Sequence, residues 1–225
     1  MDESVVIQHP AAAAQQLILL FHGVGADAQD LAPLGRVLAA EFPQACIASI
    51  GALAPSDLGV GRQWFAVQGL TEENRPARVA AALPRFLDII RSWQDRSGVG
   101  VEGTALVGFS QGAIMALAAA ASVPALAGRV LSIAGRFALL PEAALPGVTL
   151  HLFHGKADPV IAYRHTVVAA ERLVSLGADV TADVLPFVGH EISADLAVLL
   201  AERLRTHIPR RLWEEALRAD PGAPK

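Results

Sequence analysis

The stretch from residue 104 to residue 121 reads TALVGFSQGAIMALAAAA, and it decides the fold. Its first six residues, Thr104–Phe109, form a short apolar run typical of a buried strand, and the residues after Gly112 favour a helix. Ser110 stands between them, with a glycine two positions away on either side. A strand and a helix joined so tightly nearly collide, so small residues are required at those positions. This G-x-S-x-G pattern predicts a sharp turn that holds Ser110 in a strained backbone, with its hydroxyl projecting free of the sheet.

The same alternation of strand and helix patterns extends along the rest of the chain. Further strand-like runs lie at Leu17–Phe21, Ala45–Ile50, Arg129–Ile133, Thr149–Phe153 and Asp179–Leu185. Helical patterns lie at 28–41, 76–96, 112–121, 162–176 and 192–206. Pro84 is expected to kink or split the second of these helices. The alternation predicts an α/β fold with a mostly parallel central sheet and helices on both faces. Ligands bind at the carboxyl ends of such strands, so functional residues are expected directly after them.

The chain is large enough for one well-packed core. It has 225 residues, of which 53% are hydrophobic and 18% are charged, and this composition excludes a disordered chain. We expect a single domain over residues 1–208, followed by a C-terminal amphipathic helix and tail at residues 209–225. The helix, Pro209–Ala219, is expected to dock onto the domain, and the alternative is that it binds a partner. Asp220–Lys225 are expected to form a disordered tail.

Charge and cysteine content exclude several classes of protein. The formal net charge is −4, so nucleic-acid binding is not expected. The one cysteine, Cys46, rules out a disulfide framework within the chain and fits a reducing compartment. The acidic residues 1–4 do not resemble a targeting segment, so a cytoplasmic location is predicted. Residues 103–128 carry no charge, but glycine, proline and polar residues interrupt them, so no membrane span is expected.

A serine hydroxyl becomes a strong nucleophile only when a base removes its proton, and histidine is the usual base. In folds that use this turn, the order along the chain is serine, acid, histidine. Among the histidines after Ser110, His165 and His207 fall within helical patterns, whereas His190 follows the last strand. His190 is therefore the predicted base, and the alternative is a loop histidine without a catalytic role.

The predicted acid is Asp158, because it lies in a loop directly after a strand. Asp179 and Asp183 lie at the start and in the middle of a strand pattern. The alternative for Asp158 is a turn-forming Asp-Pro pair. His151 and His154 precede Asp158, but residues three apart on a strand point to opposite faces. No metal site is therefore expected there.

Two further groups of residues are predicted to complete the site. The tetrahedral intermediate of acyl transfer needs two backbone N–H donors, and these are assigned to Val24, in a glycine-rich loop, and to Gln111. The glycine-rich segment 51–75 has no clear periodicity and holds an aromatic pair, Trp64 and Phe65, that is expected to be exposed near the mouth. This pair is predicted to bind substrate, and the alternative is that both rings anchor the loop to the core.

Four blocks of the sequence resemble those of a known family: Phe21-His22-Gly23-Val24-Gly25, Gly108-Phe109-Ser110-Gln111-Gly112-Ala113, His154-Gly155-Lys156-Ala157-Asp158-Pro159-Val160 and Gly189-His190. They occur in the order found in the phospholipase/carboxylesterase family, an α/β-hydrolase group that includes bacterial carboxylesterases and acyl-protein thioesterases. The segments Gly61–Phe65 and Thr71–Arg75 resemble a bacterial esterase subgroup more closely than the thioesterases. Thioesterase relatives often carry an aspartate after the Trp-aromatic pair, where this chain has Ala66.

The resemblance implies an α/β-hydrolase fold, a triad of Ser110, Asp158 and His190, and no cofactor. The expected activity is that of a serine carboxylesterase that hydrolyses small to medium acyl esters, small molecules, through an acyl-enzyme. The alternative is an acyl thioesterase or lysophospholipase that uses the same triad. A non-catalytic ligand-binding relative is a third reading, but such proteins usually lack a member of the triad. The sequence leaves the oligomeric state open, including a homodimer.

Overall fold

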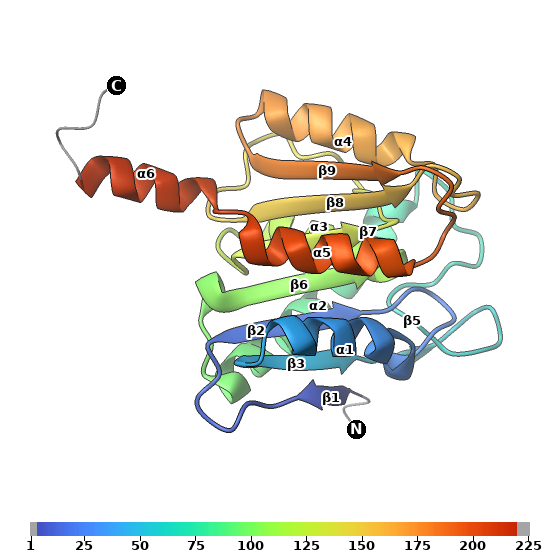
Figure 1. The fold of residues 1–225 in the computed structure, drawn as a ribbon. Helices are drawn as coiled ribbons and strands as arrows, with labels where there is room; N and C mark the ends of the chain where they lie inside the picture. Colours follow the sequence, from blue (N-terminus) through green and yellow to red (C-terminus); the bar gives the residue numbers. More distant parts are fainter. Residues whose placement is uncertain (1–3, 220–225) are drawn as a thin grey trace.

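A seven-stranded sheet forms the centre of the molecule in the computed structural model, which describes residues 4–219 (Figure 1). The strand order is β1-β3-β2-β6-β7-β8-β9, in which β1 is antiparallel and the other six strands are parallel. The strands are β1 (Val5–Gln8), β2 (Gln16–Phe21), β3 (Ala45–Ile50), β6 (Thr104–Phe109), β7 (Arg129–Ile133), β8 (Thr149–Gly155) and β9 (Asp179–Leu185). A separate pair, β4 (Ala54–Pro55) and β5 (Arg62–Gln63), lies in the segment predicted to be an aperiodic loop.

Helices cover both faces of the sheet (Figure 1). One face carries α1 (Ala32–Glu41) and α5 (Ala194–Thr206), and the other carries α2 (Arg75–Ser97), α3 (Gln111–Ser122) and α4 (Arg164–Ser175). Two 3-10 turns, η1 (Ala28–Leu31) and η2 (Val101–Gly103), precede α1 and β6. The predicted mostly parallel sheet with helices on both faces is confirmed.

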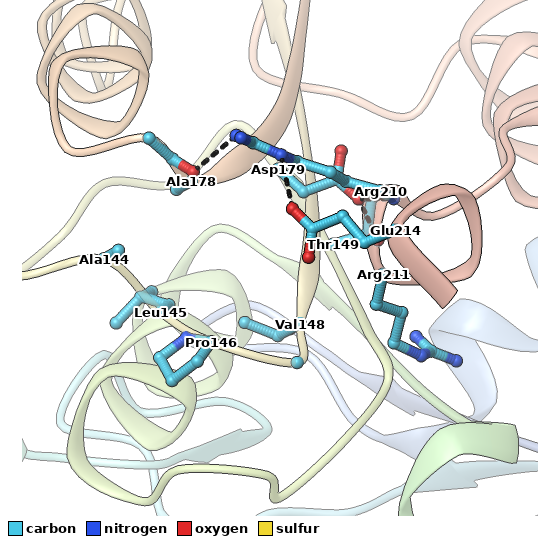
Figure 2. Close-up of a pocket in the computed structure, with 12 residues that line it drawn as sticks. Ala144, Leu145, Pro146, Val148, Thr149, Ala178, Asp179, Arg210, Arg211 and Glu214 are labelled. Carbon is cyan, nitrogen blue, oxygen red and sulfur yellow. Dashed lines mark hydrogen bonds and ion pairs between the residues drawn. The ribbon is translucent and has the colours of Figure 1, made fainter. Parts of the chain in front are cut away.

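The last helix, α6 (Arg210–Ala219), extends away from the sheet (Figure 1). Its first turn is attached to the start of β9, where Asp179 accepts hydrogen bonds from the Arg210 backbone N–H at 3.0 Å and from the Thr149 hydroxyl at 2.6 Å. A cavity of about 250 Å³ lies beside these residues, at the amino ends of β8 and β9 (Figure 2). The predicted docking of the helix is wrong, because the side chains of Leu212, Trp213 and Leu217 are exposed. The predicted tail, Asp220–Lys225, lies outside the described residues.

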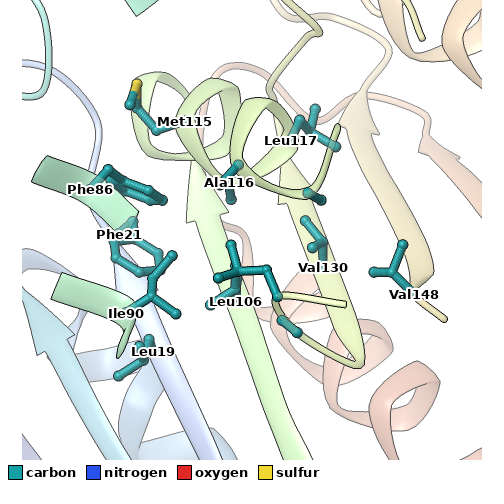
Figure 3. Packing of buried hydrophobic residues seen from close by; sticks show 14 of the residues in the cluster. Leu19, Phe21, Phe86, Ile90, Leu106, Met115, Ala116, Leu117, Val130 and Val148 are labelled. Carbon is teal, nitrogen blue, oxygen red and sulfur yellow. The ribbon is translucent and has the colours of Figure 1, made fainter. Parts of the chain in front are cut away.

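The core is divided by the sheet into two layers of side chains. Alternate residues of β2 point to opposite faces, so that Leu19 and Phe21 pack toward α2 and α3 while Leu20 packs toward α1. Figure 3 shows the first layer, in which residues of β2 and β6 meet Phe86 and Ile90 of α2 and residues of α3. Strands buried on both faces explain the continuous apolar runs in the sequence.

The turn between β6 and α3 depends on two close approaches that only glycine permits. A Cβ at Gly108 would overlap the backbone of Gly112 and Ala113, and a Cβ at Gly112 would overlap the carbonyl oxygen of Phe21. The helix therefore begins directly against the ends of β6 and β2. The predicted need for small residues on both sides of Ser110 follows from this contact.

Two local predictions from the sequence are incomplete or wrong. Helix α2 runs unbroken through Pro84, so the predicted split does not occur. Pro84 and Ala80 are both exposed, so water can hydrate the Ala80 carbonyl that loses its hydrogen bond. The antiparallel edge strand β1 was not predicted, because four residues are too short for a clear periodicity. Within residues 4–219, no helix is long and apolar enough to cross a membrane.

The contact at Gly108 predicts a large difference between two glycine substitutions. Gly108→Ala is expected to reduce the free energy of unfolding by about 3 kcal/mol, because the new methyl group meets backbone that cannot move aside. Gly100→Ala is the matched control, since nothing lies within 4 Å of a Cβ built there, and its effect should stay within about 0.5 kcal/mol. Urea unfolding measures both values, and equal values for the two variants would contradict the close approach.

Candidate active site

Ser110 occupies the turn between β6 and α3 in a strained conformation. Its backbone angles are φ 52° and ψ −113°, in the region of positive φ that non-glycine residues rarely adopt. The Ser110 N–H donates to the Ile133 carbonyl at the end of β7, at 2.9 Å, and this bond helps to hold the turn in place. The predicted strained turn is therefore present. The serine lies at the carboxyl edge of the sheet, where ligands of such folds bind.

His190 and Asp158 meet Ser110 at that edge from two other loops. The Nε2 atom of His190 lies 2.9 Å from the Ser110 Oγ, and its Nδ1 lies 2.7 Å from the Asp158 Oδ2. An ionised carboxylate can only accept, so Nδ1 carries the ring proton and donates to Asp158. Nε2 is then free to accept the proton of the serine hydroxyl. The three predicted residues are thus brought together in a geometry that can activate a hydroxyl.

The Asp158 carboxylate is completely buried and fully hydrogen-bonded. Its Oδ1 accepts from the backbone N–H groups of Val160 and Ile161 at 2.8 and 2.9 Å. Burial alone would raise the pKa of Asp158, but the hydrogen bond from His190 and these two N–H groups outweigh it and lower the pKa below its ordinary value. Asp158 therefore stays ionised at neutral pH, in the state that orients the imidazole.

A second histidine, His154, also contacts the buried carboxylate. Its Nε2 lies 2.7 Å from the Ile161 carbonyl and 3.2 Å from the Asp158 Oδ2, and its Nδ1 lies 2.8 Å from the Thr166 hydroxyl. A carbonyl cannot donate, so Nε2 carries the proton and the Thr166 hydroxyl donates to Nδ1. Burial lowers the pKa of His154, which keeps it a neutral donor. His154 thereby helps to fix the orientation of Asp158.

From the sequence, His154 was considered only as a metal ligand, and so this contact was missed. A polar residue inside an apolar strand needs hydrogen-bond partners, and that requirement was the available signal. His151, three residues earlier, bonds instead to Thr181 at 2.8 Å and to Arg129 at 3.2 Å. Burial of the His151 ring, together with the nearby charges of Arg129 and His207, lowers the pKa of His151 to about 3. The two strand histidines therefore belong to separate networks on opposite faces of the sheet.

Two backbone N–H groups flank Ser110 without a partner. They belong to Val24, in the loop after β2, and to Gln111, the first residue of α3; among residues 4–219 neither N–H meets a hydrogen-bond acceptor. A Cβ at Gly23 would lie 3.2 Å from the Ser110 Cβ, so the loop after β2 rests directly against the serine. The two N–H groups thus belong to segments that meet at Ser110, and their binding of an anionic oxygen stays a prediction.

The side chain of Gln111 ties the segment 51–75 to the start of α3. Its Oε1 accepts from the Trp64 backbone N–H and its Nε2 donates to the Phe65 carbonyl, both at 2.7 Å. The indole N–H of Trp64 donates to the His22 carbonyl at 2.9 Å. The aromatic pair therefore lies next to both predicted N–H donors, at the edge of the sheet where it was expected.

The exposure predicted for the aromatic pair is only partly correct. Phe65 is buried, with 6% of its surface exposed, and Trp64 is half-buried. The Trp64 ring packs edge-on against Phe21 and Phe86, with centroids 5.6 and 5.1 Å apart. These contacts favour anchoring of the loop to the core, and binding of substrate by Trp64 and Phe65 stays a prediction.

The fold and this arrangement of serine, histidine and aspartate define an α/β hydrolase. The chain belongs to the phospholipase/carboxylesterase family, whose model matches residues 2–208. It is thus an enzyme, a carboxylic ester hydrolase. The esterase YpfH of Escherichia coli (strain K12) is 48% identical over 212 residues, which cover 94% of this chain and 91% of that protein. The family resemblance expected from the sequence is confirmed.

Solved structures share the same fold. Esterase PE8 has a TM-score of 0.82 at 25% identity, over 92% of this chain and 99% of that one. SOBER1 of Arabidopsis thaliana has a TM-score of 0.72 at 22% identity, over 88% of this chain and all of that one. A carboxylesterase of Mesorhizobium loti has a TM-score of 0.74 at 20% identity, over 91% of this chain and all of that one. The predicted α/β-hydrolase fold is confirmed.

Removal of the Trp64 ring separates the two interpretations of the aromatic pair. Trp64→Ala is expected to reduce the free energy of unfolding by about 2–3 kcal/mol, because the ring packs on Phe21 and Phe86. A substrate contact would add a loss of kcat/KM that grows with acyl chain length, whereas equal fractional losses assign Trp64 to the scaffold alone. The control is Trp213→Ala, since this tryptophan of α6 is 57% exposed and its loss should change neither Tm nor kcat/KM.

Proposed function

We propose that this chain is a serine carboxylesterase that hydrolyses small to medium acyl esters through an acyl-enzyme intermediate. The observation that carries the proposal is the pair of distances at His190, 2.9 Å to the Ser110 hydroxyl and 2.7 Å to the Asp158 carboxylate. A hydroxyl, an imidazole and a buried carboxylate within hydrogen-bond distance are the groups that acyl transfer to a serine requires. Family membership and the similarity to an esterase support the same activity.

Acylation begins when His190 accepts the Ser110 proton and the Ser110 Oγ attacks the ester carbonyl carbon. The carbonyl oxygen becomes an anion, which the N–H groups of Val24 and Gln111 stabilise. His190 then donates its proton to the ester oxygen, the carbon–oxygen bond breaks, and the alcohol leaves. Asp158 stabilises the imidazolium during both proton transfers.

Deacylation repeats these steps with water as the nucleophile. His190 takes a proton from water, the hydroxide attacks the acyl carbon, and the carboxylic acid leaves as Ser110 regains its proton. In the proposed cycle, the groups of this chain and one water molecule account for each proton transfer and for each bond that forms or breaks. The proposed reaction therefore needs no cofactor. The proposal includes a small-molecule acyl ester as the partner and a cytoplasmic location, which the buried free thiol of Cys46 supports.

The same groups would also cleave an acyl thioester or a lysophospholipid, so substrate preference is a separate measurement. A panel of p-nitrophenyl esters and acyl thioesters with acyl chains of increasing length compares these activities directly. The proposal expects higher kcat/KM for the esters of short and medium chains. Higher kcat/KM for long-chain thioesters would favour the thioesterase alternative.

Covalent labelling tests the role of Ser110. A fluorophosphonate is expected to form one adduct, on the Ser110 Oγ with release of fluoride, because this hydroxyl lies 2.9 Å from the predicted base. Ser110→Ala should lose the label and reduce kcat by roughly 10⁴- to 10⁶-fold without a change in Tm. Mass spectrometry of the labelled protein locates the adduct, and an adduct at another residue would rule out the assignment.

The role of Asp158 is tested by an isosteric change. Asp158→Asn is expected to reduce kcat by about 10⁴-fold at unchanged KM, because the amide favours the wrong tautomer of His190. Asp183→Asn is the control: this carboxylate of β9 pairs with Arg203 at 2.8 Å and is not in contact with His190. Steady-state kinetics on one short-chain ester compare the two, and near-normal activity of Asp158→Asn would assign the acid to another residue.

A further inference from the structure

An apolar cavity of about 520 Å³ opens beside His190, on the face of the sheet that carries α1 and α5. Its walls come from η1, from α1, and from the segment that joins His190 to α5. The apolar side chains that line it include those of Leu31, Pro33, Leu34, Val37, Ile192 and Ala197. A volume of this size suits a small organic ligand.

The position of the cavity relative to the reacting groups identifies which part of an ester would enter it. His190 itself forms part of the wall, as do Gly23 in the loop after β2 and Phe109, whose ring packs at a tilt against the His190 ring with centroids 5.0 Å apart. In the proposed cycle, His190 donates its proton to the ester oxygen of the leaving group. The substituent on that oxygen must therefore lie on the His190 side of the tetrahedral carbon.

We propose that this cavity is the subsite for the alcohol part of the ester, and that it selects neutral alkyl or aryl alcohols of medium length. The inference rests on the proposed esterase function and adds the class of leaving group. Trp64 and Phe65 pack in the layer on the opposite face of the sheet, with α2 and α3. Neither ring lines the cavity, so the alcohol subsite is distinct from the predicted contact with those aromatic residues.

The charged residues of the cavity wall restrict further which alcohols we expect to bind there. The acidic residues Asp30 and Glu191 line the cavity and are exposed, and no lysine or arginine is among the described residues of its wall. An alcohol that carries a carboxylate or a phosphate would meet repulsion there without a compensating cation. Neutral alcohols avoid this repulsion and gain from the apolar walls.

Two matched series of esters test the subsite. One series holds the acyl group as acetate and lengthens the alcohol from methyl to butyl to hexyl, and the other holds the methyl alcohol and lengthens the acyl group. Each methylene buried in the cavity is expected to raise kcat/KM of the acetate series by roughly threefold to fourfold. Acetate esterified to 6-hydroxyhexanoate, which carries a terminal carboxylate, should have a lower kcat/KM than hexyl acetate.

Two variants that fill the cavity connect this length dependence to its walls. Val37→Trp and Ala194→Leu add volume at residues that line the cavity and are partly open to solvent, so that the fold can accept them. Each should reduce kcat/KM for hexyl acetate at least tenfold and change that for methyl acetate less than twofold. Val198→Leu is the control. Val198 lies on α5, the helix that begins at Ala194, but its side chain is exposed, so this substitution should change neither value.

The outcomes separate failure of the subsite from failure of the proposed function. Loss of activity on methyl hexanoate rather than hexyl acetate would place the acyl group in the cavity and overturn the inference, with the esterase function intact. Unchanged length dependence in both filled variants would overturn it as well. If the wild-type chain hydrolyses no ester and Ser110 takes no fluorophosphonate label, the proposed function fails, and the inference fails with it.

Discussion

The close approach of α3 to the ends of β2 and β6 is the constraint on which the rest of the site depends. Glycine at positions 108 and 112 allows the helix to begin against strand backbone, and the chain passes through the positive φ of Ser110 to do so. Because β2 ends at the same contact, the loop that follows it lies against the serine. One packing requirement therefore brings together Ser110 and the two segments that carry the free N–H groups.

Polar contacts from distant parts of the chain then connect the surrounding loops to that place. Gln111 has two parts to play, since its backbone N–H is a predicted donor while its side chain binds the backbone of Trp64 and Phe65. Glu72, near the end of that segment, pairs with Arg136 after β7 at 2.7 Å and with Arg75 at 2.9 Å. His154 likewise contacts the Asp158 carboxylate, at 3.2 Å, and helps to orient it. Groups that must not move during catalysis are oriented by partners of this kind.

The sequence predicts those parts of this arrangement that depend on short, continuous segments of the chain. The apolar and β-branched runs predict four strands with their observed bounds, including Thr104–Phe109, because residues that favour a strand set each run apart from its neighbours. The residues brought together at Ser110 were predicted because each follows a strand. The exposure of Trp64 and Phe65 and the position of α6 could not be predicted, because both depend on tertiary contacts between segments far apart in the chain. The cavity could not be predicted from the sequence for the same reason, since its walls come from residues 22–37, 109 and 190–197.

His190 carries out the proton transfers of the proposed cycle and also forms part of the cavity wall. This double role has a kinetic consequence. An alcohol released in the proposed cycle is protonated by a residue that forms the wall of its own subsite, so it stays beside the imidazole until it diffuses away. Water must then take its place next to Nε2 before the acyl-enzyme can be hydrolysed. Pro33, Val37 and Ala194 line the cavity and are exposed to solvent, so its outer wall is open. An open wall lets the apolar groups favour the ester during acylation while the alcohol still leaves before deacylation, which is the balance that turnover requires.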